Sequence, residues 1–155
     1  MSEDYRSLWI KNLRRIKMAK KIVLMTVFLL ITMGLQLEAS AGDYNFIAAQ
    51  DLHKRISAES SMIIIDILPA EQFAKGHIKG AIETNAYPVK TEAEKARLAE
   101  YLPKIMESTD DVVIICPRGS GGAKRTFDFY KDNGVEEKRL LILEKGMNAW
   151  PYEVE

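Results

Sequence analysis

Residues 112–123 read VVIICPRGSGGA, and this stretch decides both the fold class and the place of the candidate site. The β-branched run Val112–Ile115 predicts a buried strand, and a Gly-rich turn then leads into a helical pattern. Cys116, the single cysteine of the chain, stands at the end of that strand. Backbone N–H groups of the turn and the positive end of a helix dipole favour an anion there. The pattern therefore predicts a thiolate nucleophile at Cys116, with a buried structural cysteine as the alternative.

Predicted strands and helices alternate along the chain on both sides of this stretch. Short apolar runs predict strands at residues 45–47, 62–67, 112–115 and 140–143, and a turn at residues 77–82 enters another short strand. Helical patterns cover residues 48–57, 69–75, 91–102 and 123–132, the third of them interrupted at Pro103. The alternation predicts a single α/β domain, with a central parallel sheet flanked by helices.

Two chemistry-bearing residues end strands of this predicted sheet. Asp66 closes one apolar run and Cys116 closes another. Because ligands of open α/β sheets bind beyond the carboxyl ends of the strands, both residues are expected at one edge. An acid in that position more often caps the following turn, so we expect a structural role for Asp66.

The first 41 residues have the order of a signal peptide. Basic residues at 14–21 precede an apolar stretch at 22–35, and small residues follow up to Ala41. The apolar stretch is shorter than the about 20 residues that span a bilayer. We therefore expect a signal peptide over residues 1–41, cleavage after Ala41, a domain over residues 42–155, and a periplasmic or secreted protein. An uncleaved N-terminal membrane anchor is the alternative.

Composition excludes several function classes. Residues 1–41 hold seven Lys/Arg and three Asp/Glu, so the remainder carries 15 basic and 19 acidic side chains. No basic stripe remains for nucleic acid, and no stable membrane association is expected after cleavage. A single cysteine forms no internal disulfide, which agrees with a free reactive thiol. The two histidines, His53 and His77, have no second ligand at metal-binding spacing, so no metal or cofactor is expected.

Three motifs in order resemble the rhodanese-like domain family. Residues 66–81 read DILPAEQFAKGHIKGA, which is similar to the family's Asp-Val-Arg, Glu-Phe and Gly-His-Ile-x-Gly-Ala signature. Residues 146–150 read GMNAW, which resembles the closing Gly-Met-x-x-Trp. The strand, the cysteine and the Gly-containing loop lie between them, in the family's order. The resemblance extends over residues 43–155.

The resemblance implies a sulfurtransferase, which the predicted signal peptide would export. In this family a cysteine thiolate, here Cys116, takes the outer sulfur of thiosulfate or a polysulfide-like donor as a persulfide and passes it to cyanide or a thiol. The implied partners are a small sulfur-containing anion and a thiol or persulfide on another protein. The implied substrate-binding residues form the loop after the cysteine: Arg118, Gly119, Ser120, Gly121, Gly122 and Ala123.

Two departures from the family pattern bear on activity. Leu68 stands where the family has the Arg after the Asp, which removes an ion pair. The loop has Gly121 and Gly122 where the family often carries an Arg near the far end of the loop. Gly122 also stands where the related Cys-x5-Arg phosphatases carry the Arg that stabilises a phosphoryl transition state, so a phosphatase is not expected. The Gly-rich loop suits a bulky donor. A non-catalytic sulfur carrier of the same fold remains the alternative to an enzyme.

The expected source of thiolate stabilisation is the backbone. We expect the N–H groups of residues 118–123 to face the sulfur, a helix to begin near Ala123, and Gly121 to adopt a positive φ. Arg118 is expected to bind the donor. Lys124 and Arg125 in the first helical turn oppose the dipole, which leaves open a role in anion binding.

Overall fold

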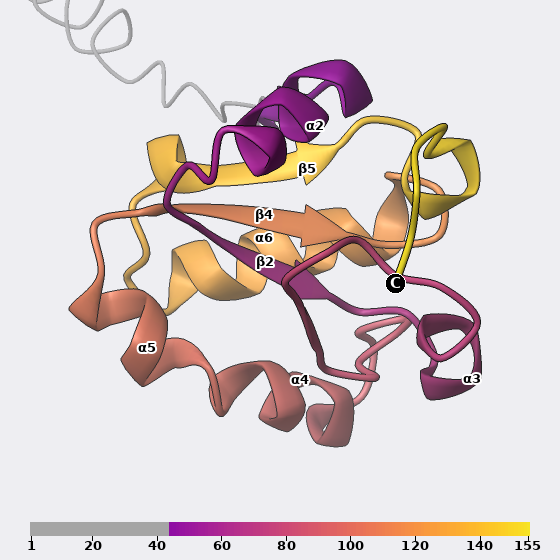
Figure 1. Ribbon diagram of the computed structural model, residues 1–155. Coiled ribbons are helices and arrows are strands. Elements are labelled where there is room, and N and C mark those ends of the chain that lie inside the picture. Colours follow the sequence, from indigo (N-terminus) through magenta and orange to yellow (C-terminus); the bar gives the residue numbers. More distant parts are fainter. Residues whose placement is uncertain (1–43) are drawn as a thin grey trace, which may run out of the picture. The chain divides into compact units, whose positions relative to one another are not determined.

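Five parallel strands form the centre of the structure, a computed structural model that describes residues 44–155. The strand order is β1-β5-β4-β2-β3, so β4, the strand that ends just before Cys116, lies in the middle of the sheet (Figure 1). The register pairs Asp66 at the end of β2 with Ile115 at the end of β4. The strands are β1 (Phe46–Ile47), β2 (Met62–Asp66), β3 (Ala81–Glu83), β4 (Asp111–Ile115) and β5 (Leu140–Leu143).

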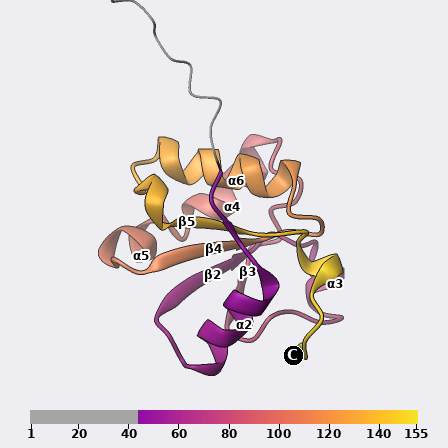
Figure 2. The same ribbon diagram turned by 90° about the horizontal axis from the view of Figure 1, so that it is seen from above.

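Helices cover both faces of this sheet (Figure 2). Apolar side chains of α4, α5 and α6 pack on one face, and those of α2 and α3 pack on the other. The helices are α2 (Ala49–Ser57), α3 (Ala70–Phe73), α4 (Glu92–Ala99), α5 (Leu102–Glu107) and α6 (Gly121–Asp132), with short 3₁₀ helices η1 (Glu137–Arg139) and η2 (Met147–Ala149). The α/β fold with a flanked parallel sheet, predicted from the sequence, is confirmed.

The continuous apolar runs of the strands follow from burial on two faces. In β4, Val112 and Ile114 face the α6 side, whereas Val113 and Ile115 face the α2 side, and all four are fully buried. Successive side chains of a strand point to opposite faces, so a sheet covered on both sides needs apolar residues at every position. This explains why the runs predicted strands correctly.

The helix predicted over residues 91–102 ends earlier, and a second helix that was not predicted follows it. The Thr91 side chain caps α4 in a reciprocal pair with Glu94, and the helix ends at Ala99. A second helix, α5, begins at Leu102 with Pro103 in its first turn. Proline lacks an N–H, but the first turn of a helix has no intrahelical acceptor for that N–H, so Pro103 starts a helix here.

The last six residues return along the α2 side of the molecule. His77 and Glu155 exchange two backbone hydrogen bonds, N–H to O, of 3.0 and 2.9 Å. The Tyr152 ring stacks on His53 at 3.8 Å between ring centroids, and Trp150 meets His53 edge-on. We refer to residues 150–155 as the tail.

The predicted signal peptide and its cleavage site after Ala41 lie outside the described residues. Among residues 44–155, none of the helices is both long enough and apolar enough to span a bilayer.

Candidate functional site

The thiol of Cys116 lies under the loop that joins β4 to α6. Cys116 is 1% exposed, and its Sγ accepts a hydrogen bond from the backbone N–H of Gly119 at 3.1 Å. The loop turns back over the sulfur because Gly119 adopts a φ of +61°, in the left-handed region. An amide N–H directed at the sulfur is also a donor for a negatively charged sulfur atom.

Residues 146–148, in the closing motif of the sequence, contact this loop through their backbone. The N–H of Met147 donates to the Cys116 carbonyl at 2.9 Å, and the N–H of Asn148 donates to the Pro117 carbonyl at 3.0 Å. Gly146 has a φ of +64°, and a Cβ on it would lie within 3.0 Å of backbone atoms of Cys116, Arg118 and Gly119. Residues 146–148 are therefore part of the site. The sequence pattern contained them as a family landmark, but it assigned them no role.

The remaining loop glycines belong to the helix. Helix α6 begins at Gly121, two residues before the predicted start. The positive φ expected at Gly121 occurs instead at Gly119. A Cβ on Gly122 would meet the Tyr87 ring at 3.0 Å and Ile67 at 3.1 Å, so that glycine allows the helix to approach its neighbours. Ala123 is buried in the core, and Ser120, the N-cap residue, is exposed.

Of the three cations considered from the sequence, the structure places one at the site. Arg118 is exposed and lines the pocket described below. Lys124 lies over the Tyr44 ring, with Nζ 4.7 Å from the ring centroid. Arg125 donates from Nε and Nη2 to the Pro88 carbonyl at 2.9 and 2.7 Å. Both of these side chains have structural contacts instead of facing the sulfur.

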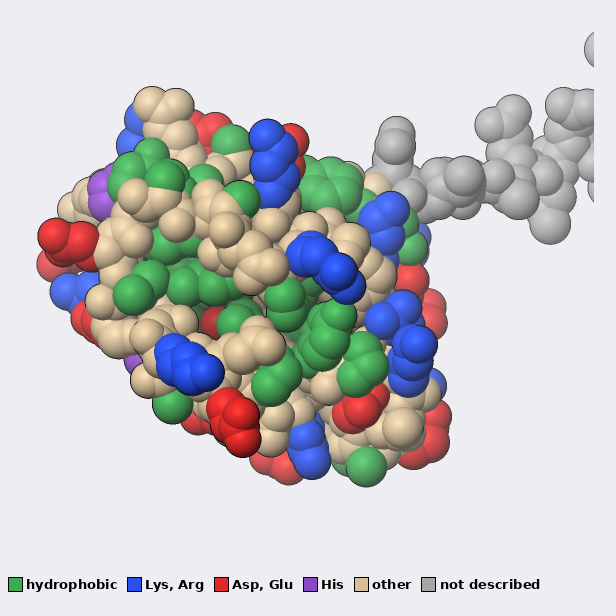
Figure 3. All heavy atoms as spheres, turned by 90° about the vertical axis from the view of Figure 1, so that its right-hand side faces the viewer, with side chains coloured by type: hydrophobic (Ala, Val, Ile, Leu, Met, Phe, Trp, Pro, Cys, Tyr) green, Lys and Arg blue, Asp and Glu red, His purple; other side chains and the backbone are tan. Residues whose placement is uncertain are grey.

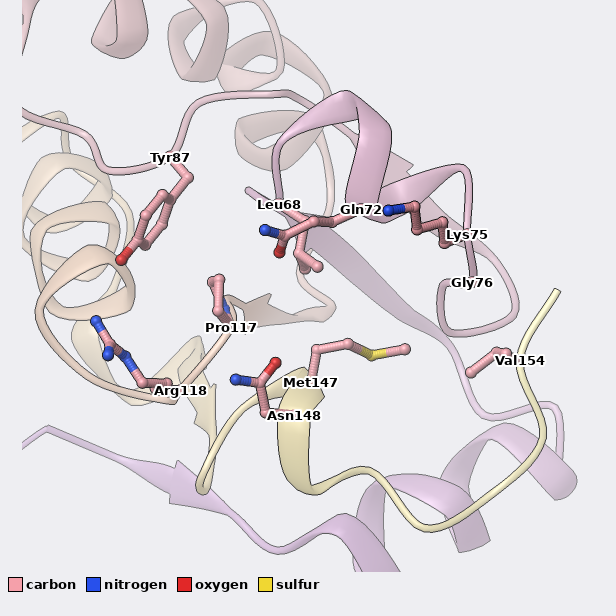
Figure 4. Close-up of a pocket in the computed structure, with 10 residues that line it drawn as sticks. All are labelled: Leu68, Gln72, Lys75, Gly76, Tyr87, Pro117, Arg118, Met147, Asn148 and Val154. Atoms are coloured by element: carbon pink, nitrogen blue, oxygen red, sulfur yellow. The ribbon is translucent and has the colours of Figure 1, made fainter.

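A pocket of about 580 Å³ opens beside the loop. Figure 3 shows this edge of the sheet as a hollow of hydrophobic side chains with Lys and Arg side chains around it. Within residues 44–155, no three His, Cys, Asp or Glu side chains cluster to hold a metal ion. The side chains and backbone that line the pocket come from the loop, η2, the tail and the segment after β2 (Figure 4): Leu68, Gln72, Lys75, Gly76, Tyr87, Pro117, Arg118, Met147, Asn148 and Val154.

Asp66 is fully buried at the end of β2. Its Oδ1 accepts the Leu68 N–H at 2.8 Å, which is the predicted turn-capping contact. Its Oδ2 has no hydrogen-bond partner in the described part of the chain. Burial raises the pKa of this carboxyl to about 7; the Leu68 N–H opposes the rise and the nearby Glu83 carboxylate adds to it.

Comparison with known proteins agrees with this architecture. A family model described as the rhodanese-like domain matches residues 48–153. No curated protein matches the chain. A rhodanese-related protein of Thermoplasma volcanium is 22% identical, with 72% of this chain and 98% of that chain covered and a TM-score of 0.52.

Two other similar structures are named for activities other than sulfur transfer. A yeast protein tyrosine phosphatase of the rhodanese family is 16% identical, with 72% and 86% of the two chains covered and a TM-score of 0.56. An As-Sb reductase from Leishmania major is 17% identical, with 70% and 77% covered and a TM-score of 0.54. These likenesses show the shared fold. With the matched family model and the loop geometry, they lead to one conclusion: the chain belongs to the rhodanese-like domain family.

Proposed function

We propose that the protein is a sulfurtransferase in which Cys116 carries the transferred sulfur as a persulfide. The Cys116 thiolate attacks the outer sulfur of thiosulfate, a new S–S bond forms, and sulfite leaves with the electron pair of the broken bond. An acceptor thiolate or cyanide then attacks the terminal sulfur of the persulfide. The products are a new persulfide or thiocyanate, and the Cys116 thiolate is restored.

The observation that carries the proposal is the Gly119 N–H aimed at the Cys116 sulfur at 3.1 Å. The persulfide, like the thiolate, is an anion, so a loop that stabilises one also accepts the other. The N-terminus of α6, a helix of 12 residues, follows within two residues of that donor. The dipole of such a helix contributes about 0.3–1 kcal/mol to an anion near its N-terminus.

The loop geometry favours sulfur transfer over phosphate ester hydrolysis. In a Cys-x5-Arg motif that begins at Cys116, the arginine would stand at position 122. That position is Gly122, which is buried against Tyr87 and Ile67. The guanidinium of Arg125, the nearest arginine in α6, is held by the Pro88 carbonyl. Phosphatases of the Cys-x5-Arg type hold the equatorial oxygens with a guanidinium at that position, whereas the arginine at this site, Arg118, comes two residues after the cysteine. Sulfur transfer to a thiolate needs no such clamp.

The proposal is tested by loading the protein with thiosulfate and measuring its intact mass. We expect the wild-type chain to gain one sulfur atom and Cys116→Ser to gain none; because the chain has one cysteine, the gain identifies the site. Cyanide should then release thiocyanate and return the protein to its original mass.

The same experiment separates an enzyme from a carrier. Repeated release of thiocyanate from one protein molecule indicates turnover, and a single release indicates the non-catalytic carrier. Absence of any mass gain with thiosulfate, a polysulfide or an organic donor contradicts the proposed function.

A further inference from the structure

We propose that the hydroxyl group of Tyr87 is a catalytic hydrogen-bond donor in the first half of sulfur transfer. It donates to the oxygens of the sulfonate group that leaves thiosulfate as sulfite. This inference rests on the proposed function and adds to it a residue that lies outside the loop after Cys116.

Tyr87 is held at the wall of the pocket by its backbone and by its ring. Its N–H donates to the Ile67 carbonyl at 2.8 Å, which fixes the residue beside the end of β2. The ring lies against the first turn of α6, where a Cβ on Gly122 would be 3.0 and 3.1 Å from two ring carbons. The same ring packs against the buried cluster that contains Cys116. The fold therefore fixes Tyr87 close to the loop that holds the thiol.

The hydroxyl of Tyr87 is available for a ligand. The hydroxyls of Tyr44, Tyr101 and Tyr130 donate to protein oxygens, whereas the hydrogen bonds found within residues 44–155 include none from the Tyr87 hydroxyl. In Figure 4 this hydroxyl points toward the guanidinium of Arg118, which lines the same pocket. A hydroxyl and a guanidinium that face one space from two sides can both donate to an oxyanion.

The first half-reaction places negative charge where these two groups can bind it. The Cys116 thiolate forms a bond to the outer sulfur of thiosulfate, the bond between the two donor sulfurs breaks, and its electron pair leaves with sulfite, SO3²⁻. Negative charge on the sulfonate group grows during this step, so a donor aimed at its oxygens binds the transition state more tightly than it binds thiosulfate. The proton stays on the Tyr87 oxygen, and no oxidant or reductant is consumed.

The second half-reaction gives the hydroxyl no such group to bind. Cyanide takes the terminal sulfur of the persulfide, and the electron pair of the broken S–S bond returns to the sulfur of Cys116. No oxyanion takes part, and the sulfur that gains the charge is the one that the Gly119 N–H faces at 3.1 Å. A role for Tyr87 in binding the leaving group therefore predicts an effect on loading alone.

The test replaces Tyr87 with phenylalanine, which keeps the ring against Gly122 and removes only the hydroxyl. Thiosulfate and inorganic tetrasulfide are each used to load the wild type and the variant, and intact mass follows the loss of unloaded protein. We expect the second-order rate constant for thiosulfate to fall by about tenfold or more in Tyr87→Phe, as for the loss of a hydrogen bond to a charged group. Tetrasulfide releases trisulfide, which has no oxygen, so its rate constant should change little. Both donors are compared on one preparation, so any inactive fraction cancels in the ratio.

Two controls accompany this comparison. Tyr152→Phe is the matched variant, because Tyr152 stacks on His53 and does not line the pocket. We expect it to load at the wild-type rate with both donors. Cyanide added to fully loaded Tyr87→Phe measures the second half-reaction, and thiocyanate release should proceed at the wild-type rate.

An equal loss of rate with thiosulfate, tetrasulfide and cyanide would overturn the inference, because it would mean that the hydroxyl has a structural role. Unchanged loading of Tyr87→Phe by thiosulfate would also overturn it, as would a wild type that loads from tetrasulfide and not from thiosulfate. In each of these cases the persulfide still forms, so the proposed function would stand. If the wild type loads from neither donor, the proposed function and this inference are overturned together.

Discussion

Replacing Gly146 with alanine is expected to lower the free energy of unfolding by about 2–5 kcal/mol and to slow sulfur loading strongly. The φ of +64° disfavours any residue with a Cβ. The added Cβ would also lie within 3.0 Å of the Cys116 carbonyl oxygen and of the backbone nitrogens of Arg118 and Gly119. Backbone atoms cannot move aside as a side-chain end does, so the loop over the sulfur must shift. The measurements are urea denaturation and the rate at which the protein gains the mass of one sulfur atom with thiosulfate.

Two other glycines provide controls for this variant. Gly80 has a φ of +76° and open space around its missing Cβ, so Gly80→Ala should cost only the backbone strain, about 1 kcal/mol. Gly121→Ala adds a methyl group in the same loop region, where the nearest atom is Nη1 of the Arg125 side chain at 3.1 Å and no backbone atom lies close. We expect that variant to fold and load normally. If Gly146→Ala is no more destabilising than Gly80→Ala, the close approach of Gly146 to the backbone of residues 116–119 is contradicted.

Asp66→Asn is expected to stabilise the protein at pH 8 by up to about 4 kcal/mol. The pKa of Asp66 is raised to about 7 in the folded protein, against 3.8 for an ordinary aspartate. Between these values the folded state binds more protons than the unfolded state. The free energy of unfolding of the wild type therefore falls as the pH rises from about 4 to about 7, and stays low above that. Asparagine keeps an oxygen for the Leu68 N–H and carries no charge.

Urea denaturation between pH 4.5 and 8 measures this difference. The wild type and Asp66→Asn should have similar stability at the acid end and separate progressively as the pH rises. Asp132→Asn, at an exposed position at the end of α6, is the matched control and should follow the wild type across the range. If the free energies of unfolding of the wild type and Asp66→Asn change with pH in parallel, the raised pKa of the buried Asp66 carboxyl is contradicted.

Strands were predictable because their signal is local. The run Leu140–Leu143 is β5 with the same bounds, since a strand covered on both faces must be apolar throughout. Helix α5 (Leu102–Glu107) was not predicted, because Pro103 indicated the end of the helix over residues 91–102, whereas a proline in the first turn of a helix can also begin one. The position of Cys116 at the end of β4 followed from the strand and the turn after it.

The parts of the site that were not predicted depend on contacts between distant segments. A loop with glycines at 119, 121 and 122 does not reveal which one takes the positive φ. In the structure Gly119 lies against the backbone of residues 143–146, and a Cβ on it would come within 3.0 Å of backbone atoms there, a contact between segments that are distant in sequence. Likewise, nothing in the periodicity of residues 150–155 indicates that they pair with His77 and supply Val154 to the pocket.

The position of the tail has a practical consequence for work with the protein. Glu155 is hydrogen-bonded to His77, and Val154 next to it borders the pocket. An affinity tag or a fused reporter attached after Glu155 would therefore begin at the rim of the pocket. There it would hinder the entry of donors and disturb the position of Val154. Comparing the sulfur-loading rate of the chain with and without a fusion after Glu155 would show how far access to the pocket limits the reaction.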